Sequence, residues 1–315
     1  GDALTDADYN TALGYRSLSA DTKGSRSVAV GRESLFNQNF STATDSYNVA
    51  VGYSAGQQVT TGTQNTLVGG EAADALTDSD FNVAVGYHAL GADTLGSRST
   101  AIGHSALAAQ NFTTATNSHN VGVGYFAGAA VTTGTQNTLI GALAGDALTT
   151  GSSNVALGFQ ALTTDTLGQS SVAIGRNALI VQNFTTATDS FNVAIGDRAA
   201  TSITTGQQNT LIGGLAGDAL SDADFNVAIG VSALGADTLG SQSVAIGNSA
   251  LGAQNLTTAT NSLNTAVGFQ AGASVTTGTS LTLIGAQAGD ALTDADYNVA
   301  VGDFALSADT LGSRS

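Results

Sequence analysis

The sequence contains no cysteine, proline, methionine or tryptophan. Without cysteine, the chain has neither disulfides nor thiolate metal sites. The lack of proline suits a chain whose backbone N–H groups are nearly all used in β-sheet ladders, because proline removes a ladder donor. No apolar run approaches the roughly 20 residues of a membrane span. We therefore expect no membrane insertion of this segment.

Basic residues are also scarce. The chain has 8 Lys and Arg against 24 Asp and Glu, which gives a net charge of −16. A surface with this balance repels the phosphates of nucleic acids and the head groups of anionic lipids. We therefore expect neither nucleic acid nor a membrane surface as a partner.

One five-residue pattern fills the sequence. It reads Asn or Ser in all but one copy, then an aliphatic residue or Thr, a small residue or Leu, an aliphatic residue, and Gly, as in Ser27–Gly31. The closing glycines are Gly14, Gly31, Gly52, Gly69, Gly86, Gly103, Gly124, Gly141, Gly158, Gly175, Gly196, Gly213, Gly230, Gly247, Gly268, Gly285 and Gly302. Their spacing runs 17, 21, 17, 17 and then repeats, a super-repeat of 72 residues. Such a period is typical of a solenoid, in which each unit, here called a rung, contacts mainly its neighbours.

The alternation within each rung predicts a short β-strand, because β-branched residues dominate and no helical period is present. In Asn82–Gly86, Val83 and Val85 point to one face of the strand and Ala84 points to the other. Both faces are apolar, as in strands that are covered on both sides. We expect the valine face to fill the inside of the coil. The alanine face is then covered either by the coil folding back or, as we favour, by identical chains around a common axis.

The glycines predict tight corners at the ends of the strands, because glycine accepts positive φ angles. We assign this structural role to Gly31, Gly52, Gly69, Gly86 and Gly103 and to the asparagines that open the pattern, such as Asn48 and Asn82. An insert such as Gln110–Thr116 accounts for the 21-residue spacing. We expect its hydrophobic residue to fill a wider loop; the four copies are Phe40, Phe112, Phe184 and Leu256.

These rungs resemble the head repeats of YadA-type trimeric autotransporter adhesins, and they are similar to 17-residue repeats of phage-type tail fibres. The resemblance rests on Ser171–Gly175 and Asn192–Gly196, which read SVAIG and NVAIG, and it extends over essentially the whole chain. It implies a left-handed parallel β-roll, three chains associated in a fibre, and a role in attachment outside the cell.

Pairs of aspartates recur with the spacing of a calcium-binding loop. They are Asp6, Asp8, Asp78, Asp80, Asp222, Asp224, Asp294 and Asp296. The corresponding stretch Thr149–Ser153 has no acid, although the 17-residue spacing is kept. The same corner can thus be turned without carboxylates. Turn formation is therefore the favoured interpretation, with calcium as the alternative and no other cofactor expected.

Two further columns have open interpretations. Asp21, Asp93, Asp165, Asp237 and Asp309 recur every 72 residues. They form either a solvated edge or a docking row for a partner chain. Aromatic residues often follow the closing glycine; they are Tyr15, Tyr53, Tyr87, Tyr125, Phe159 and Phe269. We expect them to form an aromatic ladder between rungs or chains, with stacking on sugars as the alternative.

No nucleophile, base and orienting group stand apart from the repeat, so we expect no enzyme. The fold prediction is an all-β parallel solenoid of seventeen rungs, one continuous array over residues 1–315 and a segment of a longer fibrous protein. The predicted function is a structural fibre at the surface of a cell or virion. Its expected partners are identical chains, in a trimer or in lateral or end-to-end filaments, and a host-surface receptor or glycan. The alternative is a repeat module that binds glycan, calcium or ice.

Overall fold

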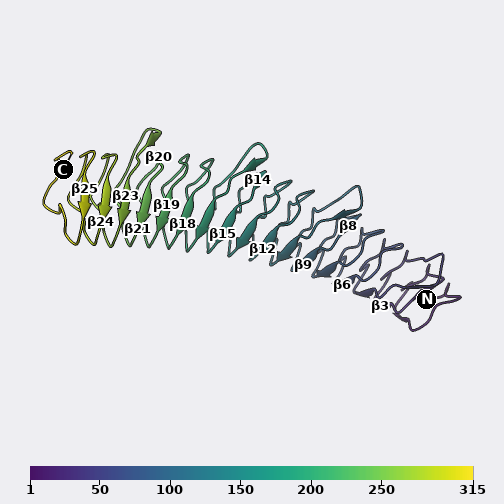
Figure 1. The fold of residues 1–315 in the computed structure, drawn as a ribbon. Helices are drawn as coiled ribbons and strands as arrows, with labels where there is room; N and C mark the ends of the chain where they lie inside the picture. The colour runs from purple at the N-terminus through teal and green to yellow at the C-terminus, as the bar shows by residue number, and fades with distance from the viewer. Residues whose placement is uncertain (315) are drawn as a thin grey trace. The chain divides into compact units, whose positions relative to one another are not determined.

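The computed structural model describes residues 1–314, and it is all-β with no helix in that range. The chain divides into two compact units, Gly1–Asn154 and Val155–Ser315. In each unit the strands follow one another side by side in chain order (Figure 1).

Unit 1 has eight three-residue strands, one per rung. They are β1 (Thr11–Leu13), β3 (Val28–Val30), β5 (Val49–Val51), β6 (Thr66–Val68), β7 (Val83–Val85), β9 (Thr100–Ile102), β11 (Val121–Val123) and β12 (Thr138–Ile140). Each pairs in parallel with the next, and equivalent residues of the rungs lie opposite each other. Two-residue strands pair a 17-residue rung with the longer loop of the 21-residue rung that follows it, as β2 (Gly24–Ser25) with β4 (Thr44–Asp45) and β8 (Gly96–Ser97) with β10 (Thr116–Asn117).

Unit 2 repeats this design with nine three-residue strands. They are β13 (Val155–Leu157), β15 (Val172–Ile174), β17 (Val193–Ile195), β18 (Thr210–Ile212), β19 (Val227–Ile229), β21 (Val244–Ile246), β23 (Thr265–Val267), β24 (Thr282–Ile284) and β25 (Val299–Val301). They pair in parallel in chain order with the same register. The short pairs are β14 (Gly168–Gln169) with β16 (Thr188–Asp189) and β20 (Gly240–Ser241) with β22 (Thr260–Asn261).

Both units are therefore parallel β-solenoids built of 17- and 21-residue rungs, which confirms the predicted fold class. In unit 2, the turns labelled β14 and β20 extend beyond the other turns (Figure 1), and they pair with β16 and β22 in the inserts of the 21-residue rungs. Their hydrophobic residue is buried as predicted, since Phe40, Phe112, Phe184 and Leu256 are 5–6% exposed. The left hand of the coil stays a prediction.

The prediction for the inner face was wrong. Ala84 in the middle of β7 is buried, whereas Val83 and Val85 lie on the outside and are half-buried. The physical reason is the small cross-section of the coil. The buried Ala89 and Leu90 from the turn after the strand occupy the interior together with Ala84, so the mid-strand position has room for little more than a methyl group.

Where the mid-strand residue is larger, the facing turn is smaller. Leu67 in the middle of β6 is fully buried. A Cβ atom on Gly56, in the turn of the preceding rung, would approach the Leu67 side chain to 2.6 Å. A larger side chain in the strand is thus compensated by a smaller residue in the turn, which keeps the volume that fills the interior the same.

The closing glycines have the predicted backbone conformation, with φ of +135° at Gly31 and Gly86 and +145° at Gly52. A Cβ atom on Gly86 would collide with the carbonyl oxygen of Gly103 in the next rung. The prediction for asparagine was wrong, because the left-handed residue is the one before it. Tyr47, with φ of 51°, precedes Asn48, and the asparagine itself turns inward.

Candidate functional surface

The inward asparagines form a hydrogen-bonded column along the inside of each unit. Asn48 Oδ1 accepts a hydrogen bond from the backbone N–H of Asn65 at 2.9 Å, and Asn48 Nδ2 donates to the carbonyl of Gly62 at 2.7 Å. Asn82 N–H donates in the same way to Asn65 Oδ1 at 2.9 Å. Each side chain thus satisfies a buried N–H group and a buried carbonyl group of the next rung.

Four of the five aspartates of the Asp21 column, Asp21, Asp93, Asp165 and Asp237, are buried, so both sequence interpretations were wrong for them, whereas Asp309 is half-buried. Asp21 is 0% exposed. Its Oδ1 accepts hydrogen bonds from the backbone N–H of Gly24 at 2.9 Å and of Phe40 at 3.4 Å, and its Oδ2 accepts one from Gln38 Nε2 at 2.6 Å. Asp93, Asp165 and Asp237 have the equivalent partners in their own super-repeats. These donors take the place of water, which lets a carboxylate lie inside the coil.

Burial raises the pKa of Asp93, opposed by the hydrogen bonds from Gln110 and from the N–H groups of Phe112 and Gly96. Gln110 also accepts a hydrogen bond from Asn120 at 2.9 Å. The carboxylate is therefore linked to the asparagine column. Its role is to tie the wider loop of the 21-residue rung to the body of the coil.

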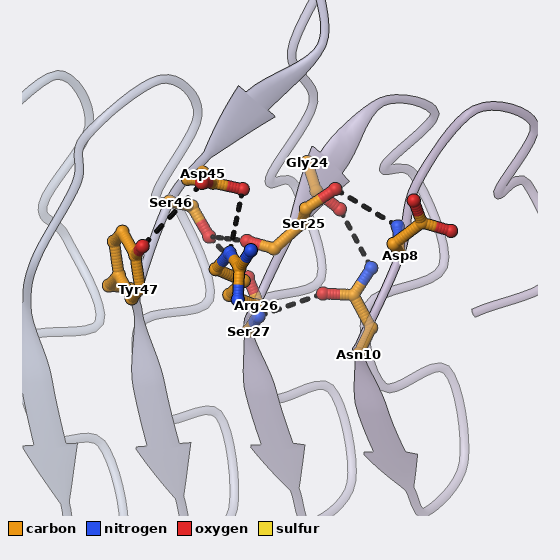
Figure 2. A network of polar contacts seen from close by, with 9 residues as sticks. All are labelled: Asp8, Asn10, Gly24, Ser25, Arg26, Ser27, Asp45, Ser46 and Tyr47. Atoms are coloured by element: carbon orange, nitrogen blue, oxygen red, sulfur yellow. Dashed lines mark hydrogen bonds and ion pairs between the residues drawn. The ribbon is translucent and has the colours of Figure 1, made fainter.

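The predicted calcium ligands lie in exposed turns, where most of them bond to the preceding rung. Asp80 Oδ1 accepts from the N–H and Oγ1 of Thr63 at 2.7 and 2.9 Å, and Asp78 Oδ1 accepts from Thr61 at 2.7 Å. Asp222, Asp224 and Asp296 accept equivalent bonds from Thr205, Gln207 and Thr279. Asp294 accepts from its neighbour Thr293 at 3.3 Å. Asp6 is exposed, and the carboxylate of Asp8 points away from its neighbours (Figure 2). Within residues 1–314, no three acidic or histidine side chains converge as a metal site.

A cation and two aromatic rings meet near these turns in unit 1, and Figure 2 shows the cation, Arg26, with one of the rings, Tyr47. Arg26 forms an ion pair with Asp45 at 3.0 Å, which raises the pKa of Arg26, and Tyr47 donates to the same carboxylate at 3.5 Å. The guanidinium lies 5.0 Å from the ring centroid of Tyr9 and 5.8 Å from that of Tyr47. Because these groups are exposed, the pair contributes little to stability, but it fixes the orientation of both rings.

The outer strand face is formed by the first and third residues of the three-residue strands. Every one of these residues is Val, Ile, Leu or Thr. They are partly exposed, for example 38% at Ile102 and 43% at Leu157. In each unit the third positions form a continuous aliphatic column, and the first positions form a column of valine and threonine. The outer strand face thus carries no charged side chain, on a chain of net charge −16.

The corner row is formed by the residues directly after the closing glycines. In unit 1 it reads Tyr15, Arg32, Tyr53, Gly70, Tyr87, His104, Tyr125 and Ala142. The four tyrosines are 50–64% exposed and recur in every second rung. They do not stack directly on one another, and a ladder between chains stays a prediction. Arg32 lies between Tyr15 and Tyr53, and His104 lies between Tyr87 and Tyr125. The order of the residues that follow successive closing glycines in the sequence already shows this alternation.

Two features of the turns were not foreseen from the sequence. Asp74 is half-buried, and burial raises its pKa. Its Oδ1 and that of Asp290, 216 residues along the repeat, are buried without a hydrogen-bond partner.

Residues 1–314 enclose no pocket, and they include no helix long and apolar enough to cross a bilayer.

Comparisons of the chain with protein-family models, curated proteins and solved structures found no match.

Proposed function

We propose that this chain is a structural shaft of an extracellular fibre or filament, at the surface of a cell or virion, with a role in attachment. The observation that carries the proposal is the unbroken parallel ladder of each unit. Stacked rungs extend a chain along one axis and need no singular centre. An enzyme needs one group of reactive residues in a perturbed environment. A chain whose residue pattern repeats from rung to rung does not favour such a single group.

Identical chains are the partners proposed for the outer strand face. Exposed apolar surface of this continuity is costly in water and marks a site of association. All 24 acidic residues lie outside the outer strand face. Copies of the chain therefore meet there with the least repulsion between like charges. A trimer around a common axis, as the resemblance to YadA-type heads implies, covers this face in each chain.

Analytical ultracentrifugation tests this association. We expect a mass three times the chain mass of 31.0 kDa. The double variant Val83→Lys/Val85→Lys places two charges on the outer strand face and is expected to sediment as a monomer with an unchanged β-sheet circular dichroism spectrum. Thr113→Lys/Thr114→Lys, at exposed residues of a long loop, is the matched control and should keep the trimer mass. A wild-type chain that is monomeric at all concentrations contradicts the proposal.

A second candidate function, recognition of a glycan, is favoured by the regular tyrosines of the corner row. A glycan would supply the attachment role with a ligand.

A further inference from the structure

The corner row of unit 1 presents flat rings at a constant interval. Tyr15, Tyr53, Tyr87 and Tyr125 each follow a closing glycine, two rungs apart. With a strand spacing of about 4.8 Å, neighbouring tyrosines are about 9.6 Å apart along the coil. All four lie at least half exposed on the same column of the same solenoid. The row is thus a series of identical platforms for a ligand that repeats with the same period.

Side chains of the intervening rungs hold the rings in place. The Arg32 guanidinium lies 5.9 Å from the ring centroid of Tyr15 and 5.6 Å from that of Tyr53. The His104 ring lies 5.4 Å from that of Tyr87 and 5.5 Å from that of Tyr125. Rings that are oriented before a ligand arrives lose less freedom on binding. The tyrosines are therefore preorganised along the row.

Hydrogen-bonding groups lie beside the platforms. Glu33 accepts a hydrogen bond from Gln57 at 3.1 Å and contacts Arg32 at 3.5 Å. A hydrogen bond with Glu71 is the main cause that raises the pKa of Tyr87. Carboxylates, a guanidinium and an imidazole next to exposed rings offer both donors and acceptors to hydroxyl groups.

A linear polysaccharide combines the properties that this row would recognise. A sugar ring has an apolar C–H face that packs on an aromatic ring, and hydroxyl groups around its edge. In a β-1,4-linked chain every second sugar presents the same face, a repeat close to two strand spacings. Stacked bases of a single-stranded nucleic acid are disfavoured because their phosphates are repelled by a chain of net charge −16.

We propose that the corner row of unit 1 binds an extended, neutral β-1,4-linked polysaccharide, with alternate sugars stacked on Tyr15, Tyr53, Tyr87 and Tyr125. The inference gives the attachment role its ligand and to that extent rests on the proposed function. It does not require association between chains, since it concerns the corner row rather than the outer strand face.

Unit 2 lacks this series and supplies an internal control. The same column reads Phe159, Arg176, Asp197, Gly214, Val231, Asn248, Phe269, Ala286 and Asp303. Asp197 interrupts the two-rung series and is tied to Arg176 by hydrogen bonds of 2.8 and 3.0 Å, which lower the pKa of Asp197. No two consecutive platforms of this column in unit 2 are aromatic, so an extended chain finds no continued stacking there.

Isothermal titration calorimetry of the full chain with cellohexaose and chitohexaose tests the proposal. Each hexaose spans three disaccharides and is expected to bind more tightly than its disaccharide, whereas maltohexaose, which is α-1,4-linked, is expected not to bind. Tyr53→Ala and Tyr87→Ala should each weaken binding about tenfold, the loss of one stacking contact. Phe269→Ala is the matched control in unit 2 and should leave the affinity unchanged.

The outcomes separate this proposal from the proposed function. Absence of binding by both β-1,4-linked hexaoses, or unchanged affinity in Tyr53→Ala and Tyr87→Ala, overturns the glycan proposal while the trimer mass stands. Retained hexaose binding by a monomeric chain overturns the association and leaves the corner row as a glycan site. Because both tyrosines are exposed, circular dichroism and the melting temperature of the variants should match those of the wild type.

Discussion

The side-chain oxygen of Asn48 accepts a hydrogen bond from the backbone N–H of Asn65, one rung away, at 2.9 Å. Two asparagines of the same column thus link successive turns through the interior of the coil. Serine and, once, leucine take the place of asparagine in this column, but twelve of its seventeen positions are asparagine. The column is a second ladder beside the backbone ladder of the strands. Its side chains satisfy the buried N–H and carbonyl groups of the turns without water.

Removal of one member of this column should loosen its rung. Asn65→Ala deprives the N–H of Asn82 of its acceptor and the carbonyl of Ser79 of its donor. Buried groups left without partners cost about 1–3 kcal/mol each. We expect a lower melting temperature and faster hydrogen exchange at the Asn82 amide. Gln64→Ala, at the exposed neighbouring position, should change neither quantity, and equal effects of the two variants would refute this role for the asparagine column.

The volume exchange between Leu67 and Gly56 predicts a coupling between them. Gly56→Ala adds a methyl group against the Leu67 side chain at a residue with φ of +59°, and such overpacking costs about 1–3 kcal/mol. Leu67→Ala alone leaves a cavity. The double variant should be less destabilised than the sum of the single variants, as measured by thermal unfolding of all four proteins. Strict additivity would mean that the two side chains do not share one space.

The buried carboxylate of Asp93 predicts a pH dependence of stability. Burial raises its pKa above the ordinary value of 3.8, so the folded state binds the proton more tightly than the unfolded state does. The contribution of this group to stability is therefore fully present below pH 3.8 and is lost as the pH rises through the raised pKa. Asp93→Asn removes the titration.

Melting temperatures of the wild type and of Asp93→Asn between pH 3 and 7 measure this effect. The advantage of the wild type over the variant should shrink as the pH rises from about 4. Asp78→Asn changes an exposed carboxylate and serves as the control. A wild-type advantage that grows with pH would contradict the direction given for Asp93.

Chelation distinguishes the two interpretations of the aspartate pairs. Asp80 accepts two hydrogen bonds from Thr63, a role that an amide oxygen can also fill. If the pairs form turns, EDTA should leave the melting temperature unchanged. Asp78→Asn/Asp80→Asn should then lower the free energy of unfolding by less than about 1 kcal/mol. A fall in melting temperature on chelation that calcium reverses would establish the alternative.

The sequence predicted the rung period, the strands and the glycine corners, because each depends on local patterns that recur in every repeat. It did not predict which strand face is inside. Alternation separates Val83 and Val85 from Ala84, but only the width of the coil decides that alanine is the one that fits within it. The choice therefore depends on the turn residues that share the interior.

The polar interior was missed for a related reason. Aspartate is rarely buried, so Asp21 was expected at the surface. Its burial depends on Gln38 and on two backbone N–H groups that only the folded loop brings together. The signal available was the constant 17-residue separation of Asp21 from Gln38, repeated at Asp93 and Gln110.

Cryo-electron microscopy of the purified chain tests the central claim most directly. Association through the outer strand face predicts particles with three-fold symmetry in which the strands of all three chains face the common axis, and Val83→Lys/Val85→Lys should abolish them. Single coils at all concentrations, or assemblies with the outer strand face turned to solvent, would contradict the account.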